Sequence, residues 1–274
     1  MRETARDRRI VKLVYDYRLL SQNQIERALG KARSTVQQSL MRLYHHQYLE
    51  RLFMPIAQLG SSPTLYIVGR QGIELLQSMG ISDFTGAPSK DLSPLFLAHT
   101  LAINEFRLAV TQAAERLSWA IPLWRTENEI KAEYDRVNIR VTAGRVERVP
   151  VVPDSYFVID SPQRGLAPCF LELDRGSMSL RRFKAKVAGY VAYYKHGGYE
   201  KRYGVKAFRV LTVVDGVGEG RVESLLNETA GVPGIGRRFW FTHLKDTQSH
   251  NPLTSAIWRI AGSEGLSSLF SITA

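Results

Sequence analysis

Apolar residues recur at helical spacing through the first 45 residues of the chain, in three groups. The first group predicts a helix whose buried face carries Ile10, Leu13, Val14, Tyr17 and Leu20. Ser21 and Gln24 follow with the spacing of a capping box, in which each side chain satisfies the backbone N–H of the other residue. This spacing predicts a second, short helix that ends near Gly30, where a left-handed backbone costs little.

A third helix is predicted because Ser34 and Gln37 repeat the capping-box spacing ahead of the apolar stripe Val36, Leu40 and Leu43. Two helices joined by a tight turn that contains glycine are typical of a helix-turn-helix. Two strands, 48–56 and 64–68, and a helix at 71–79 are expected to follow. The pattern therefore predicts a winged helix-turn-helix domain over residues 1–80.

Residues 81–94 contain glycine, proline and serine without periodicity, and they are interpreted as a linker. A long amphipathic helix is predicted at 95–117, with His99 and Asn104 as a satisfied buried pair. Beyond it, helices are expected at 180–195 and 221–230. Apolar runs predict strands at 121–125, 146–152, 155–159, 168–173, 207–214 and 239–242. The prediction is an α+β protein whose second domain, 95–274, is an α/β domain with a mixed sheet.

The predicted third helix exposes a polar face suited to the major groove of DNA. In a helix-turn-helix, the first residues of this helix meet base edges, and glutamine and arginine pair with adenine and guanine. The candidate DNA-binding residues are Arg33, Ser34, Thr35, Gln37, Gln38 and Arg42, with Arg51 in the wing as a phosphate contact. Winged helices also serve as protein-interaction modules, so that alternative stays open.

Charge favours the nucleic-acid interpretation. The formal net charge is +11, and residues 1–90 carry 13 basic and 7 acidic side chains. Such a balance attracts polyanions such as double-stranded DNA.

A single cysteine, Cys169, excludes an internal disulfide and a cysteine zinc cluster. Since there is no membrane-length apolar run and no secretory signal, a cytoplasmic location without membrane partners is expected.

The candidate chemistry lies in three carboxylates, Asp154, Glu172 and Asp174. Glu172 and Asp174 are two residues apart on a predicted strand, so both leave the same face. Carboxylates that converge repel one another unless a cation offsets them, and oxygen ligands suit Mg²⁺ or Mn²⁺. Lys186, which shares a helix face with Tyr190, is the candidate for stabilising a transition-state charge. The alternative is a strand-initiating turn at Asp154 and a solvated strand face whose acids pair with Arg175, Arg181 or Arg182.

These residues occur in an order that resembles the PD-(D/E)XK nuclease fold and, more specifically, the replication-relaxation family. The resemblance rests on the winged helix and on the segments Leu97-Ala98-His99-Thr100-Leu101-Ala102-Ile103-Asn104, Val152-Pro153-Asp154, Phe170-Leu171-Glu172-Leu173-Asp174-Arg175-Gly176 and Lys186-Val187-Ala188-Gly189-Tyr190. It implies a protein of plasmids or other mobile elements, with Asp154, Glu172 and Asp174 as metal ligands and Lys186 as a further catalytic residue.

The chain departs from the nuclease pattern at one position. The residue two after the glutamate is usually lysine, and here it is Asp174. An active site would take its lysine from Lys186 or, as a second choice, from Lys184, and Glu127 or Glu129 could add a carboxylate. A covalent tyrosyl mechanism would use Tyr190 or Tyr193.

Two functions are therefore expected as alternatives. In the first, the winged helix recognises a duplex site of a mobile element and the second domain nicks or cleaves DNA with a divalent metal. In the second, the nuclease-like domain is inactive and the protein regulates replication, mobilisation or transcription, as a homodimer or with other proteins of the element. Neither the His-x-His spacing of other relaxases nor a phosphate-binding P-loop occurs in the sequence.

Overall fold

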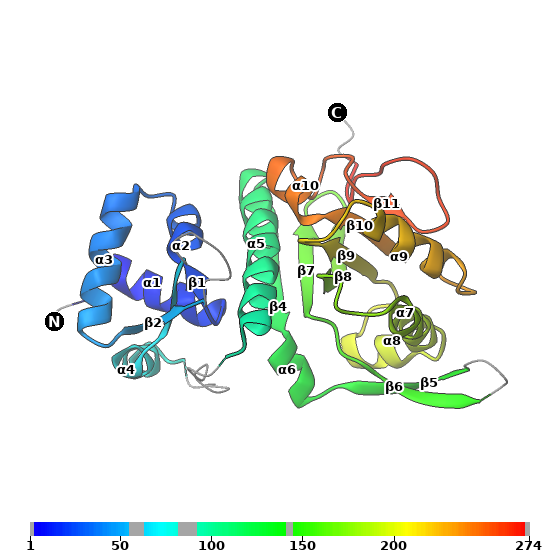
Figure 1. Cartoon of the computed structure of the whole chain (residues 1–274), viewed down its shortest axis with the longest axis horizontal. Helices are drawn as coiled ribbons and strands as arrows, with labels where there is room; N and C mark the ends of the chain where they lie inside the picture. Colours follow the sequence, from blue (N-terminus) through cyan, green and yellow to red (C-terminus); the bar gives the residue numbers. More distant parts are fainter. Residues whose placement is uncertain (1–2, 55–62, 82–91, 141–144, 272–274) are drawn as a thin grey trace. The chain divides into compact units, whose positions relative to one another are not determined.

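The computed structural model describes residues 3–54, 63–81, 92–140 and 145–271, and the chain divides into two compact units, Met1–Leu108 and Ala109–Ala274 (Figure 1). The division falls within the long helix α5 (Pro94–Arg116). The bounds of α5 agree with those of the helix predicted at 95–117. Most of the predicted linker, 81–94, lies outside the described residues.

The first unit contains four short helices: α1 (Ala5–Asp16), α2 (Gln22–Leu29), α3 (Arg33–His45) and α4 (Arg70–Ser78). The capping box of α2 is confirmed, since Gln24 N–H donates to Ser21 and Ser21 N–H donates to the Gln24 side chain. Gly30 ends α2 with a φ of 59°, a left-handed conformation that favours glycine. The local sequence therefore sets both ends of this helix.

The second predicted capping box is wrong. Helix α3 begins at Arg33, its N-cap is Ala32, and no side chain caps it. Ser34 thus lies inside the first turn and is exposed to solvent. The spacing to Gln37 is present, but the chain enters the helix two residues too early for Ser34 to be the cap.

Strands β1 (Leu20–Ser21), β2 (Leu49–Phe53) and β3 (Thr64–Val68) form a small antiparallel sheet in the order β1-β3-β2. Three helices followed by the β2–β3 hairpin reproduce the element order of a winged helix. Residues 55–62, which include the end of the predicted strand 48–56, lie outside the described residues. Asn104 of α5 donates to the carbonyls of Tyr17 and Leu19 at 3.2 and 2.6 Å, which confirms it as a satisfied buried side chain.

The second unit is built on a six-stranded mixed sheet in the order β11-β10-β9-β8-β7-β4. Its strands are β4 (Ala120–Thr126), β7 (Ser155–Ser161), β8 (Gly165–Asp174), β9 (Arg209–Val214), β10 (Phe239–His243) and β11 (Arg259–Ile260). Strands β4, β7 and β8 form an antiparallel meander, whereas β8, β9 and β10 run parallel. The mixed sheet expected from the sequence is confirmed.

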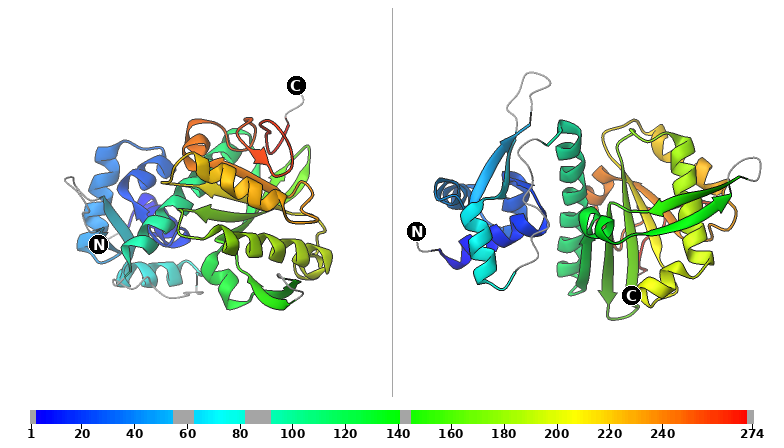
Figure 2. Two further views of the ribbon diagram at one scale, coloured as in Figure 1. Left: turned by 45° about the vertical axis from the view of Figure 1, so that its right-hand side comes forward. Right: turned by 90° about the horizontal axis from the view of Figure 1, so that it is seen from below.

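Helices α7 (Leu180–Lys195) and α9 (Gly220–Ala230) connect the parallel strands and pack on one face of the sheet (Figure 2). The unit also contains three short helices that were not predicted from the sequence, α6 (Glu127–Ala132), α8 (Gly198–Tyr203) and α10 (Leu244–Ser249). None of the helices within the described ranges is long and apolar enough to span a membrane.

The predicted strand at 146–152 is part of a separate hairpin. β6 (Val146–Val151) pairs with β5 (Asp135–Arg140) rather than with the main sheet, and the hairpin packs against α7. Gly189 of α7 allows this approach, because a Cβ there would lie 3.2 Å from Val149. Strand β5 was not predicted, although Val137 and Ile139 alternate with exposed residues.

Candidate functional site

Helix α3 presents a polar face to solvent. Its apolar residues Val36, Leu40 and Leu43 are fully buried in the core of the first unit. The opposite side exposes Arg33, Ser34, Gln37 and Gln38, and Thr35 is partly exposed. Positions 33, 34, 37 and 38 lie on one helical face because residues four apart are neighbours. These side chains point away from the core and are available to an external partner.

Arg42, which was predicted to contact DNA, has an internal partner. One of its terminal nitrogens lies 2.7 and 2.6 Å from the two oxygens of Asp7, a fully buried residue of α1. Burial raises the pKa of Asp7, but hydrogen bonds from Arg42 and Thr4 outweigh burial, so that the pKa lies below its ordinary value. The pair joins α3 to α1, and Arg42 therefore has a structural role.

Arg51, the predicted phosphate contact, lies against aromatic rings. Its guanidinium is 4.2 Å from the ring centre of Tyr44 in α3 and 5.7 Å from that of Tyr66 in β3. Its Nε is buried without a hydrogen-bond partner. The stacking couples the β2–β3 hairpin to the end of α3.

In the second unit, Asp154 lies immediately before β7 and is tied to β8. Its Oδ2 accepts a hydrogen bond of 2.7 Å from the backbone N–H of Leu173, and its own N–H donates to the carbonyl of Leu171 at 3.0 Å. These two hydrogen bonds hold the Asp154 carboxylate beside β8, the strand that carries Glu172. The two segments were predicted to be neighbours.

Glu172 is 6% exposed, and both its carboxylate oxygens have partners from α7. Lys186 donates to Oε2, and the hydroxyl of Tyr190 donates to Oε1. The i, i+4 spacing of Lys186 and Tyr190 places both on the helix face that covers β8. Lys186 of α7 is therefore a lysine that contacts Glu172, although the residue two positions after Glu172 is Asp174.

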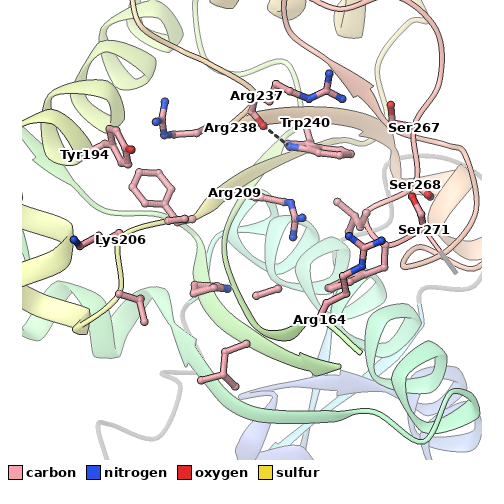
Figure 3. Close-up of a pocket in the computed structure, with 18 of the residues that line it drawn as sticks. Arg164, Tyr194, Lys206, Arg209, Arg237, Arg238, Trp240, Ser267, Ser268 and Ser271 are labelled. Carbon is pink, nitrogen blue, oxygen red and sulfur yellow. Dashed lines mark hydrogen bonds between the residues drawn. The ribbon is translucent and has the colours of Figure 1, made fainter. Parts of the chain in front are cut away.

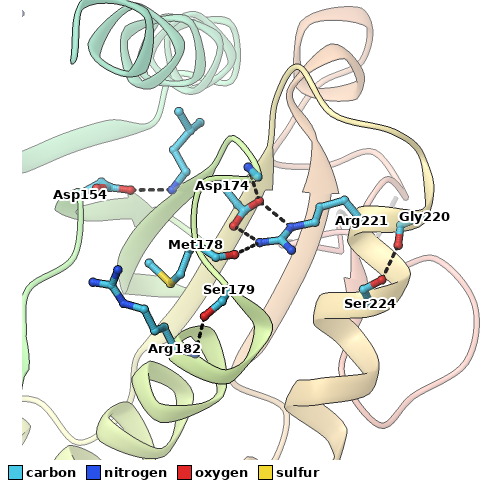
Figure 4. A network of polar contacts seen from close by, with 10 residues as sticks. Asp154, Asp174, Met178, Ser179, Arg182, Gly220, Arg221 and Ser224 are labelled. Atoms are coloured by element: carbon cyan, nitrogen blue, oxygen red, sulfur yellow. Dashed lines mark hydrogen bonds and ion pairs between the residues drawn. The ribbon is translucent and has the colours of Figure 1, made fainter. Parts of the chain in front are cut away.

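Asp174 has a different environment, although it leaves the same face of β8. Arg221, at the start of α9, donates from Nε and from a terminal nitrogen to the two carboxylate oxygens of Asp174, at 2.8 Å each (Figure 4). The backbone N–H of Gly176 donates to Oδ1 at 2.9 Å. The same Arg221 nitrogen donates to the carbonyl of Met178 at 2.6 Å, so Arg221 anchors the turn after β8.

The remaining candidates have partners of their own. Lys184 forms an ion pair of 3.2 Å with Glu228, and Tyr193 donates to Asp135 at 2.5 Å. Glu129 accepts hydrogen bonds from Thr126 in the capping box of α6, and Glu127 pairs with Lys131 at 2.7 Å. Arg175 pairs with Asp215 rather than with the strand acids. The charge of Glu127 also raises the pKa of Lys186.

Burial and neighbouring charges shift the pKa values of Glu172 and Lys186. Burial raises the pKa of Glu172 to about 7, with the charge of Asp154 adding to the rise and Lys186 and Tyr190 opposing it. Burial lowers the pKa of Lys186, but the carboxylates of Glu172 and Asp154 outweigh it and leave the pKa above its ordinary value. Lys186 therefore stays an ammonium, with two carboxyl groups acting on it.

This arrangement differs from the expected three-carboxylate site. Asp154, Glu172 and Lys186 are brought together, whereas Asp174 is neutralised by Arg221. Within the part of the chain that the structure describes, no group of three or more His, Cys, Asp or Glu side chains is placed to hold a metal ion. A divalent ion at this position would have Asp154 and Glu172 as its carboxylate donors.

Sequence reasoning missed Arg221, which lies 47 positions after Asp174 along the chain. In the sequence, Arg221 is only the first residue of the helix predicted at 221–230. A basic residue there carries no local signal, because its role depends on how α9 packs beside the end of β8.

No curated protein and no solved structure matches the chain. The model of the replication-relaxation family matches residues 11–208, which is more than half of the sequence. The match includes α3, Asp154, Glu172, Asp174 and Lys186, the segments on which the resemblance rested. The chain belongs to the replication-relaxation family.

Proposed function

We propose that this protein binds double-stranded DNA by placing α3 in the major groove. The observation that carries the proposal is the exposed face of Arg33, Ser34, Gln37 and Gln38 on a helix whose other side is fully buried. Glutamine and arginine side chains offer the donors and acceptors that match base edges. Membership of a replication-relaxation family is consistent with a partner that is DNA.

Arg33 is the residue best placed to contact phosphate, because it is exposed at the first position of α3. The N-terminus of a helix also attracts an anion through its free backbone N–H groups. Arg42 and Arg51 contribute indirectly in this account, by joining α3 to α1 and to the wing.

The test is a titration of duplex DNA with the full chain over a series of salt concentrations. Affinity should fall steeply with salt, because each neutralised phosphate releases counterions. Arg33→Glu should weaken binding about tenfold or more and reduce the salt slope by about 1. Arg148→Glu makes the same charge change at an exposed position of β6 and should have little effect. Equal losses in the two variants would reject α3 as the docking surface.

A second candidate function is cleavage of DNA. The observation that favours it is the pairing of Lys186 with Glu172 beside Asp154, since these are the lysine and two of the three carboxylates that the family resemblance assigns to a nuclease site. With Mg²⁺ or Mn²⁺ on Asp154 and Glu172, the metal would polarise the phosphodiester and lower the pKa of an attacking water. Lys186 would stabilise negative charge on the phosphoryl oxygens. Asp174 would hold the turn through Arg221.

Supercoiled plasmid incubated with the protein and Mg²⁺ or Mn²⁺ tests this second function. Relaxed or linear product that disappears in Asp154→Ala and Lys186→Ala, but persists in Lys184→Ala, would support cleavage. The absence of product from the wild type with either metal, or product that persists in Asp154→Ala, would reject it. The family-level alternative of a regulator without catalysis predicts binding in the first experiment and no product in the second.

A further inference from the structure

The second unit contains a large basic pocket that the candidate site does not use. Its volume is about 1080 Å³, and it opens where β8, β9 and β10 begin (Figure 3). Glu172 and Asp174 lie at the other end of β8. The pocket and the acidic site therefore lie at opposite ends of the parallel strands.

The lining is rich in positive charge. Four arginines and one lysine contribute to it, namely Arg164, Lys206, Arg209, Arg237 and Arg238, and no Asp or Glu is among the residues that line it. Lys206 lies 3.8 Å from Glu200 outside the pocket. In the described parts of the chain, none of the four arginines forms an ion pair with a carboxylate. Like charges held together repel one another, and an anionic occupant would offset that cost.

Two of the arginines are held in place by other contacts. Arg209 lies 5.5 Å from the ring of Trp240 and 5.4 Å from that of Phe270. Arg238 stacks 3.4 Å over Tyr194 and donates to the carbonyl of Ile235 at 2.9 Å. These contacts orient the guanidiniums and leave donors for an anion, because a guanidinium carries five N–H donors. Figure 3 shows Arg164 and Arg209 extending toward Ser268 and Ser271.

We propose that this pocket binds the phosphate backbone of a single strand of nucleic acid. Several guanidiniums spread over a cavity of about 1080 Å³ match a chain of phosphates better than one phosphate. Aromatic and arginine side chains together are typical of single-strand sites, because bases stack on rings and arginines add cation–π contacts, and the partly exposed Tyr194 with Arg238 over its ring is such a pair. A single strand can enter a concave pocket and reach the partly buried Arg209, whereas a rigid duplex would contact only its rim. The site is separate from α3 and does not require the duplex-binding proposal.

The probe is a labelled oligothymidylate of about 15 nucleotides, which forms no duplex. Fluorescence anisotropy with the full chain should give saturable binding that weakens with salt. The double variant Arg164→Glu/Arg237→Glu should lose about tenfold or more in affinity and about 2 in salt slope. The matched control Arg145→Glu/Arg148→Glu makes the same charge change at exposed positions beside and on β6 and should lose less than about threefold.

Further arms separate this proposal from its alternatives. Arg33→Glu should leave oligothymidylate binding unchanged, and Arg164→Glu/Arg237→Glu should leave duplex binding unchanged, so either site can fail alone. Parallel binding of oligouridylate and oligodeoxyuridylate, which differ only in the sugar, identifies the sugar that is preferred. Equal losses in the pocket and control variants would overturn the proposal, as would complete competition by polyglutamate or by inorganic phosphate at a concentration matched in phosphate to the oligonucleotide.

Discussion

Arg221 binds both carboxylate oxygens of Asp174 through hydrogen bonds of 2.8 Å each, while Glu172, two residues earlier on the same strand face, binds Lys186 and Tyr190. The two acids of one strand face therefore have separate roles. Asp174 anchors the turn after β8 to α9, and Glu172 remains with Asp154 and Lys186 as the candidate reactive group.

The first prediction concerns the Asp174–Arg221 pair. Arg221→Ala should lower the free energy of unfolding by about 3–5 kcal/mol, because it leaves a buried carboxylate without its partner. Asp174→Ala/Arg221→Ala should lose less than the sum of the two single variants. Urea unfolding of the four proteins measures the coupling. Losses that simply add would show that the two side chains do not depend on each other.

The second prediction contrasts two serines at the start of helices. Ser21→Ala should destabilise the first unit by about 1 kcal/mol, because it removes the cap of α2. Ser34→Ala should change stability by less than about 0.5 kcal/mol, because Ser34 is exposed within the first turn of α3. Chemical unfolding measures the change in the free energy of unfolding of each variant. A larger loss for Ser34→Ala would mean that α3 is capped as the sequence predicted.

The third prediction is a dependence of stability on pH. Burial raises the pKa of Glu172 in the folded protein to about 7 from 4.5, so the folded state holds the proton more tightly than the unfolded state. This contribution is fully present below pH 4.5 and is lost as the pH rises to about 7. The stability of the wild type relative to Glu172→Gln should therefore fall across that window.

Unfolding experiments at several pH values from 4.5 to 7 measure the effect. Glu147→Gln, at an exposed position of β6, is the control and should track the wild type. A wild type that gains stability over Glu172→Gln as the pH rises would contradict the burial argument.

The fourth prediction concerns Asn104, which satisfies the backbone carbonyls of Tyr17 and Leu19 in the buried turn after α1. Asn104→Ala should cost about 1–3 kcal/mol, because both carbonyls lose a donor that buried water does not replace. Asn23→Ala, an exposed position in α2, should cost less than about 0.5 kcal/mol. Thermal unfolding compares the two, and equal shifts in Tm would contradict the assignment.

Much of the fold could be predicted because its signals are local. The Ser21 cap, Gly30 and the faces of α3 and α7 follow from residues within a few positions of one another. The pairing of Glu172 with Lys186 and Tyr190 also follows once a helix is known to cover β8. Strand β5 was missed because its apolar pattern is short and half-exposed, and β6 was predicted as a strand but not its pairing outside the main sheet.

Other features depend on positions far apart in the sequence. Asp7 meets Arg42 only after α1 and α3 pack together, and Arg221 meets Asp174 only after α9 crosses to the end of β8. The basic pocket gathers residues from 164 to 271 that share no motif. Such partnerships depend on tertiary packing, and spacing along the chain does not contain them.

Selection of bound duplexes from a random-sequence pool measures whether α3 contacts bases. The selection compares the wild type with Gln37→Ala/Gln38→Ala and with the control Gln71→Ala/Gln77→Ala in α4. If α3 reads bases, the wild type and the control will enrich one common sequence, and the α3 variant will retain duplex binding but lose that preference. Enrichment of the same sequence by all three proteins would contradict the assignment of α3 as the reading helix.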